Sequence, residues 1–186
     1  MNLIAIDCET GGLLPEHSLL TAAIVKAELK IAERKLIFGD FLDIKVKPED
    51  GNYFINPEAL RVNGINLVRH DEEAMPYHEG GKLIHEFLSK GTHQVIVGHN
   101  VQGDVDAIIR NCISKDTFYQ NVNYNVIDTL SIANHLKALG HIPQYQKLKL
   151  VELARFFKIP VAEKKLHTAY YDAYLNLLVY EAMLQF

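Results

Sequence analysis

Residues 3–13 read LIAIDCETGGL, a short apolar stretch joined to a pair of acids. The run Leu3–Ile6 turns polar at once, which predicts a strand that enters a functional site. Asp7 and Glu9 are two residues apart, so on a strand their side chains point the same way. Carboxylates aimed together repel, and a hard divalent cation such as Mg²⁺ or Mn²⁺ is the usual remedy. Two solvated acids at a strand end are the alternative.

The flanking sequence predicts an α/β fold. Apolar stretches at 19–29 and 35–46 predict two more strands, which can form an antiparallel meander with the first. Later come a helix after Met75-Pro76, a strand at 94–98, a helix from Asp104, a strand at 125–128, helices at 129–139 and 148–157, and a last helix from Thr168 almost to Phe186. Strands that first pair antiparallel and then join through helices predict a mixed sheet.

A second acidic position follows the predicted strand at 94–98. Residues 97–104 read VGHNVQGD, so a buried strand breaks at Gly98 and delivers Asp104 to the start of a helix. Ligands of α/β sheets gather beyond the strand ends, which makes Asp104 a candidate site residue. An acid in the first turn of a helix also suits the helix dipole, so a purely structural role is the alternative.

A third acidic position lies in HTAYYDA, residues 167–173. Asp172 falls within the last predicted helix, and His167 stands at its start. Histidine is the side chain best suited to accept a proton from water near neutral pH. A surface histidine and an exposed helical acid are the alternatives, since the chain has nine histidines.

Together these stretches resemble the motifs of the DEDDh 3′→5′ exonucleases, a family that includes the proofreading subunit of bacterial DNA polymerase III, ribonuclease T and oligoribonuclease. The family motifs read Asp-x-Glu-Thr-x-Gly-Leu, Asn-x-x-Phe-Asp and His-x-Ala-x-x-Asp-Ala. The matching stretches are DCETGGL (7–13), NVQGD (100–104) and HTAYYDA (167–173), supported by INPEALRVNGI (55–65) and IDTL (127–130). The motifs keep the family's order, so the resemblance covers nearly the whole chain.

The resemblance implies a ribonuclease H-like fold, with a mixed five-stranded sheet flanked by helices, in a single exonuclease domain over residues 1–186. It implies a nuclease that removes nucleoside 5′-monophosphates from the 3′ end of single-stranded DNA or RNA. DNA is slightly favoured, because INPEALRVNGI resembles proofreading domains. One alternative is an exoribonuclease similar to ribonuclease T or oligoribonuclease. An alternative of another class is a non-catalytic module that binds nucleic acid or a replisome.

The implied chemistry depends on two divalent cations, Mg²⁺ or Mn²⁺, held by Asp7, Glu9, Asp104 and Asp172. Two such ions can stabilise both the attacking and the leaving oxygen of phosphodiester hydrolysis. His167 would accept the proton of the attacking water as general base. The resemblance therefore makes these four acids and His167 the catalytic residues.

The resemblance also places a set of residues against the substrate, in a loop where small side chains let the backbone approach the terminal sugar. They are Thr10, Gly11, Gly12, Leu13 and Asn100. Glu9 would reach the 3′-terminal hydroxyl. Leu13 or Leu14 would wedge against the last base, and a core or rim position is the alternative for both.

Two departures from the family pattern carry expectations, and Asn63 also stands where the linker of the family usually has His. Gly103 stands where the family has Phe, so another apolar group should fill that space. Gly11 stands where the family has Thr, which should loosen the turn. Asp106 is a second acid near the motif, but the spacing from Asn100 favours Asp104.

Composition limits the location and the partners. The net charge of −4 and the 48% apolar share are typical of a globular protein rather than of a basic-groove binder. Cys8 and Cys112 are too few for a disulfide framework, and no apolar run is long enough for a membrane span or a signal peptide. We therefore expect a cytoplasmic protein that contacts no membrane. Expected partners are a nucleic-acid 3′ end and, as alternatives, a second copy of the chain or a polymerase.

Overall fold

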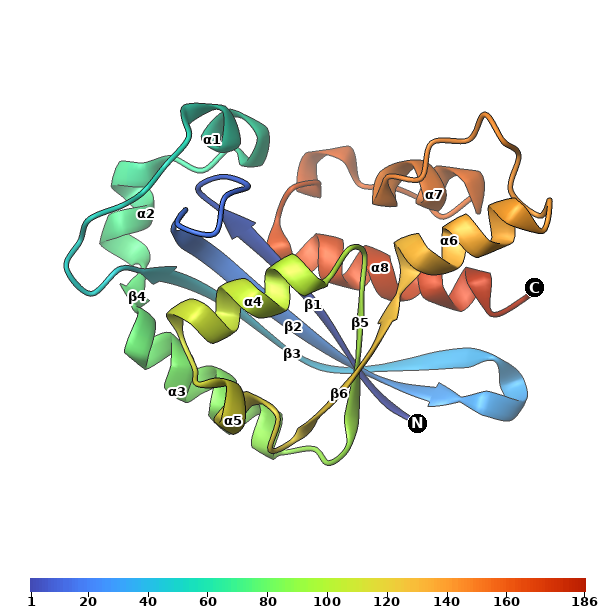
Figure 1. Ribbon diagram of the computed structural model, residues 1–186, viewed down its shortest axis with the longest axis horizontal. Coiled ribbons are helices and arrows are strands. Elements are labelled where there is room, and N and C mark those ends of the chain that lie inside the picture. Colours follow the sequence, from blue (N-terminus) through green and yellow to red (C-terminus); the bar gives the residue numbers. More distant parts are fainter.

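The computed structural model describes residues 1–186, and its centre is a six-stranded sheet with helices on both faces (Figure 1). The strand order is β4-β3-β2-β1-β5-β6. The strands are β1 (Asn2–Thr10), β2 (Leu19–Lys30), β3 (Lys35–Lys47), β4 (Met75–Pro76), β5 (Gln94–Gly98) and β6 (Val122–Asp128).

The pairing of the strands confirms the predicted mixed sheet. β1, β2 and β3 form an antiparallel meander, and β5 pairs parallel to β1 on its other side. The expected number of five strands is wrong. The sixth strand is β4, whose two residues pair in parallel with Val46 and Lys47 at the end of β3. Two residues are too few to give an apolar pattern in the sequence.

Eight α-helices surround the sheet, more than the sequence pattern predicts. They are α1 (Pro57–Asn63), α2 (Leu67–Glu73), α3 (Tyr77–Ser89), α4 (Gln102–Asn111), α5 (Lys115–Phe118), α6 (Thr129–Ala138), α7 (Leu150–Phe156) and α8 (Ala169–Met183). None of them is long and apolar enough to span a membrane. The unpredicted helices α1 and α2 begin at asparagine caps, where Asn56 accepts from Glu58 N and Asn66 accepts from Arg69 N.

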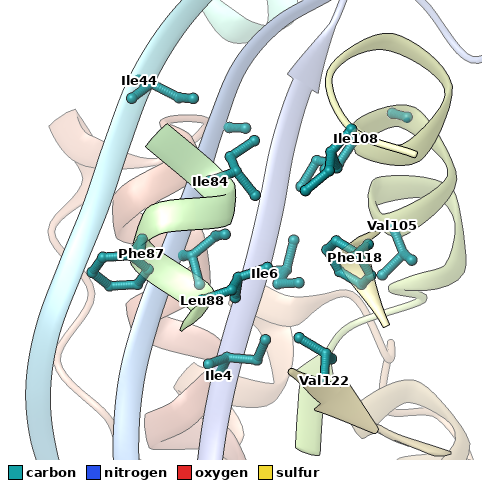
Figure 2. Packing of buried hydrophobic residues seen from close by; sticks show 14 of the residues in the cluster. Ile4, Ile6, Ile44, Ile84, Phe87, Leu88, Val105, Ile108, Phe118 and Val122 are labelled. Atoms are coloured by element: carbon teal, nitrogen blue, oxygen red, sulfur yellow. The ribbon is translucent and has the colours of Figure 1, made fainter. Parts of the chain in front are cut away.

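Strand β1 joins two apolar layers, because its side chains alternate between the faces of the sheet. Ile4 and Ile6 are fully buried in an apolar layer that also contains Ile84 and Leu88 of α3 and Ile108 of α4 (Figure 2). Leu3 and Ala5 pack on the opposite face, against α8.

The same alternation decides where the first motif points. Cys8 follows Ile4 and Ile6 and packs against their layer. Asp7 and Glu9 follow Leu3 and Ala5, so they face the side of the sheet that α8 covers. The buried half of β1 thus fixes the direction of both carboxylates.

Candidate active site

The carboxylates of the first and third motifs meet at the end of β1. One oxygen each of Asp7, Glu9 and Asp172 can be chosen so that all lie within 4.8 Å of one another. Asp7 and Glu9 come from β1, and Asp172 comes from the first turn of α8. Residues 165 positions apart in the sequence therefore offer oxygen ligands to one point.

Asp104 lies beside this group, on the first turn of α4. Its Oδ1 accepts a hydrogen bond from the backbone N–H of Cys8 at 3.1 Å, between the two acids of β1. Its charge is also one of the causes that raise the pKa of Asp7. Asp106 instead is exposed and accepts from Gln102 Nε2 at 2.8 Å. The choice of Asp104 over Asp106 thus agrees with the geometry.

Burial raises the pKa values of all four acids, and mutual repulsion adds to the shift at Asp7 and Glu9. Burial, then the charges of Asp104, Asp172 and Glu9, raises the pKa of Asp7 well above its ordinary value. Burial, then Asp172 and Asp104, raises the pKa of Glu9 to about 7. Burial raises the pKa of Asp104 to about 7 against the opposing hydrogen bond from Cys8, and burial also raises the pKa of Asp172. His167 opposes the shift at Asp172, and such raised values are typical of buried, clustered carboxylates with little counter-charge.

The donor set fits hard cations. Asp172 Oδ1 is buried and has no hydrogen-bond partner, although buried carboxylate oxygens are normally satisfied. None of the ion pairs in the chain includes Asp7, Glu9, Asp104 or Asp172. Carboxylate oxygens without nitrogen or sulfur ligands suit Mg²⁺ or Mn²⁺.

His167 stands next to this group with an exposed side chain. Its backbone N–H donates to Asp172 Oδ2 at 3.2 Å, which fixes one oxygen of that carboxylate. The residue has a φ of 60°, a left-handed conformation that is uncommon for a side chain with a Cβ. Strained backbone of this kind is held only where the surroundings determine it, and it clusters at functional sites.

Two cavities open on either side of Glu9. The first, here called the His167 cavity, has a volume of about 470 Å³ and is lined by His167, Thr21, Lys45, Asn63 and Arg69. The second, here called the Leu13 cavity, has a volume of about 340 Å³ and is lined by Thr10, Gly12, Leu13, Glu58 and Asn63. Both are lined by Glu9, so each gives access to that carboxylate.

The loop after β1 is tighter than expected. The expectation that Gly11 loosens this turn is wrong, because a Cβ there would lie 2.5 Å from both Ile55 Cδ1 and Phe54 O. Gly11 N donates to Ser18 O at 2.7 Å, and Gly11 O accepts from Asn56 N at 2.6 Å. Only glycine fits so close to the 54–56 backbone, and the close fit positions the loop against α1.

The remaining substrate-binding predictions have different outcomes in the geometry. Thr10 Oγ1 donates to Gly12 O at 2.7 Å, and Leu13 is fully exposed at the mouth of its cavity rather than in the core. Asn100 is exposed in the loop before α4, with a φ of 60°, and lines neither cavity. The expectation that an apolar group replaces the missing Phe at Gly103 is wrong, because Gly103 is exposed with nothing within 4 Å of a Cβ.

Sequence reasoning missed the wall of the His167 cavity that β3 and α2 provide. Lys45 and Arg69 both bind Glu73 there. Figure 1 shows α2 beside the end of β3, an arrangement created by tertiary packing. The one local signal was Asn66, whose side chain caps α2.

Comparison with known proteins identifies the family of the chain. A family model described as Exonuclease, that of the RNase T family, matches residues 4–180. The chain belongs to the RNase T exonuclease family. This membership confirms the resemblance to the DEDDh nucleases and the predicted class of enzyme, a 3′→5′ exonuclease. Among curated relatives, Ribonuclease T of Marinobacter nauticus is 29% identical over 181 residues, which cover 91% of this chain and 76% of that protein. Ribonuclease T of Haemophilus influenzae is 25% identical, with 73% of its length covered.

Solved structures support the fold of this RNase T family member. Exonuclease I of Methylocaldum szegediense superposes with a TM-score of 0.79 at 21% identity, over 99% of this chain. Exonuclease I of E. coli, in complex with a dT13 oligonucleotide, superposes with a TM-score of 0.78 at 19% identity. The present chain spans about two fifths of the length of each of these proteins, 40% in both cases.

Proposed function

We propose that this chain is a divalent-metal-dependent exonuclease that removes nucleoside 5′-monophosphates from the 3′ ends of single strands. The observation that carries the proposal is the approach of Asp7, Glu9 and Asp172 within 4.8 Å, with a buried Asp172 oxygen that has no partner. Four neighbouring acids, of which only Asp172 has a basic group nearby in His167, destabilise the folded chain when they ionise, unless cations bind them. The wider proposal is a single exonuclease domain over residues 1–186.

Asp7, Glu9, Asp104 and Asp172 would hold the cations. Two divalent ions supply charge stabilisation to the attacking and the leaving oxygen of an in-line displacement. His167 would take the proton of the attacking water, because its exposed side chain lines the same cavity as Glu9. The left-handed backbone at His167 directs the N–H to Asp172 and so couples the general base to a ligand.

The Leu13 cavity is the proposed site of the terminal nucleoside. Thr10, Gly11, Gly12 and Leu13 bring the backbone close to it, and the exposed Leu13 side chain is free to contact a base. Asn100 belongs to the proposal as a contact outside this cavity, since it lies in the loop that leads to Asp104.

The choice between DNA and RNA stays a prediction, with DNA slightly favoured. The curated relatives are called Ribonuclease T, whereas Exonuclease I structures contain a dT13 oligonucleotide or are described as a complex with SSB-Ct. A second copy of the chain or a polymerase as partner, and a cytoplasmic location, also stay predictions.

One assay tests the proposed function. Matched 3′-labelled and 5′-labelled strands of DNA and RNA are incubated with the purified chain, with Mg²⁺ or with EDTA. Release of labelled mononucleotide from the 3′ label, lost in EDTA, supports the proposal, and circular strands should resist. Asp104→Asn should abolish release, while its exposed neighbour Asp106→Asn should not. Strand binding without any hydrolysis would instead favour the non-catalytic module.

A further inference from the structure

A buried polar group holds α8 to the ends of β5 and β6, behind the carboxylates. Thr129, the first residue of α6, is fully buried, and Asn176 on α8 is 1% exposed. The Thr129 hydroxyl lies 2.9 Å from Asn176 Oδ1, 3.1 Å from Gly98 O and 3.0 Å from His99 Nδ1. These contacts are unusual, because the residues of α8 around Asn176 are otherwise buried and apolar.

The partners of Thr129 are close in the chain to two of the acids, Asp172 and Asp104. Asn176 is one helical turn after Asp172, so both lie along one side of α8. Gly98 ends β5 and is followed by the loop that carries Asp104. A second hydrogen bond holds the same loop to the end of β6, because Asp128 Oδ2 accepts from Val101 N at 3.1 Å.

The chemistry of the group makes it directional. A hydroxyl has one proton, and Gly98 O can only accept it. Asn176 Oδ1 can likewise only accept, so the hydroxyl donates to one of these two oxygens at a time, and its bond to Asn176 depends on the rotation of α8. Apolar packing alone is non-directional and would tolerate a small rotation or slide of the helix.

We infer that Thr129 and Asn176 are positioning residues that set the distance of Asp172 from Asp7 and Asp104. The inference depends on the proposed metal site, and it adds that the affinity of this site for a cation is determined by a hydrogen bond behind it. Groups behind metal ligands commonly change metal affinity by about 10- to 100-fold when they are removed.

The test separates positioning from stability. Thr129→Val and Asn176→Leu keep the shape but leave a buried partner unpaired, so each single variant should lower the unfolding temperature in EDTA. The double variant removes both polar groups and should regain part of that loss. Mn²⁺ affinity, measured by titration calorimetry, should stay about 10-fold or more below the parent in the double variant. Thr129→Ser should bind Mn²⁺ like the parent.

Asn111→Leu is the matched control, because Asn111 lies on α4 and donates only to Ala107 O in its own helix. It should leave Mn²⁺ binding unchanged. A double variant that folds and binds Mn²⁺ within twofold of the parent would overturn the inference while leaving the proposed function intact. A parent chain that binds no Mn²⁺ would instead overturn the proposed function, and the inference with it.

Discussion

Two glutamates line the His167 cavity in opposite surroundings. Glu73 accepts hydrogen bonds from Lys45 Nζ and Arg69 Nε, and these bonds lower its pKa to about 2. Glu9 has no cation beside it, and burial followed by the charges of Asp172 and Asp104 raises its pKa to about 7. The two glutamates line the same cavity, and their pKa values differ because their neighbouring charges and their burial differ.

The difference separates a structural charge cluster from a chemical one. Glu73 forms ion pairs with Lys45 and Arg69, which are side chains of the protein and cannot be replaced by ions from solution. The acids around Glu9 have none, so an exchangeable ion gains the most by binding there. An acidic cluster in a structure is therefore informative when its members lack basic partners.

The largest effect is expected from Glu9→Gln. The change removes one negative ligand from the proposed metal site, and metal ions contribute several kcal/mol to such reactions, so turnover should fall by about 10³-fold or more. Single-turnover release of mononucleotide measures it. Circular dichroism should show an intact fold, and wild-type turnover in a folded variant would contradict the assignment of Glu9.

The sequence predicted this group of acids because each lies in a local pattern. Asp7 and Glu9 follow an apolar strand at alternating positions, and Asp104 follows a strand that breaks at Gly98. The meander and the parallel strands were predictable for the same reason, since apolar periodicity reports burial directly. The partners of Glu73 have no such pattern, because Lys45 comes from β3 and Arg69 from α2.

The second effect is on His167. His167→Ala should lower turnover by the 10²–10⁴-fold typical of a lost general base while leaving Mn²⁺ binding in place. The dependence of turnover on pH should lose the limb that belongs to this base. His78→Ala is the matched control, because His78 is exposed and bonds to Glu49 away from the cavity. A pH profile unchanged by His167→Ala would exclude the role.

Close contacts across the chain were the part that the sequence could not predict. Nothing in the sequence near Gly11 indicates that Ile55 lies against it. The absence of a side chain therefore predicted a loose turn, whereas the turn is tightly packed. The error at Gly103 is the opposite one. The resemblance predicted a space filled by an apolar side chain, whereas α4 faces solvent at this residue. Both errors concern the tertiary contacts of a residue, which local sequence propensity does not determine.

The third effect is on stability. Because the pKa values of Glu9 and Asp104 are raised to about 7 from ordinary values of 4.5 and 3.8, the folded state binds more protons than the unfolded state between these limits. Their contribution is thus present below about pH 4 and lost as the pH rises to about 7, at up to about 1.4 kcal/mol per pH unit for one group. Denaturant unfolding in EDTA measures it.

The sign is tested with Asp104→Asn, which keeps an acceptor for the N–H of Cys8 and removes the charge. In EDTA at pH 8 this variant should be more stable than the parent, by on the order of 2 kcal/mol, and the gain should vanish near pH 4. Asp106→Asn should show no gain. A parent that is stabilised by rising pH relative to Asp104→Asn would refute the burial-raised pKa of Asp104.

The smallest effect is expected from Glu73→Gln, the counterpart of Glu9→Gln in the same cavity. Turnover should match that of the parent, because the carboxylate of Glu73 is already bound by Lys45 and Arg69. The change frees these cations, so KM for a single strand should fall at low salt, and the difference should disappear as salt screens the phosphates. A collapse of turnover like that of Glu9→Gln would place Glu73 in the chemistry. Ion pairing would then no longer distinguish the two glutamates, and every acid that lines the His167 cavity would be a candidate metal ligand.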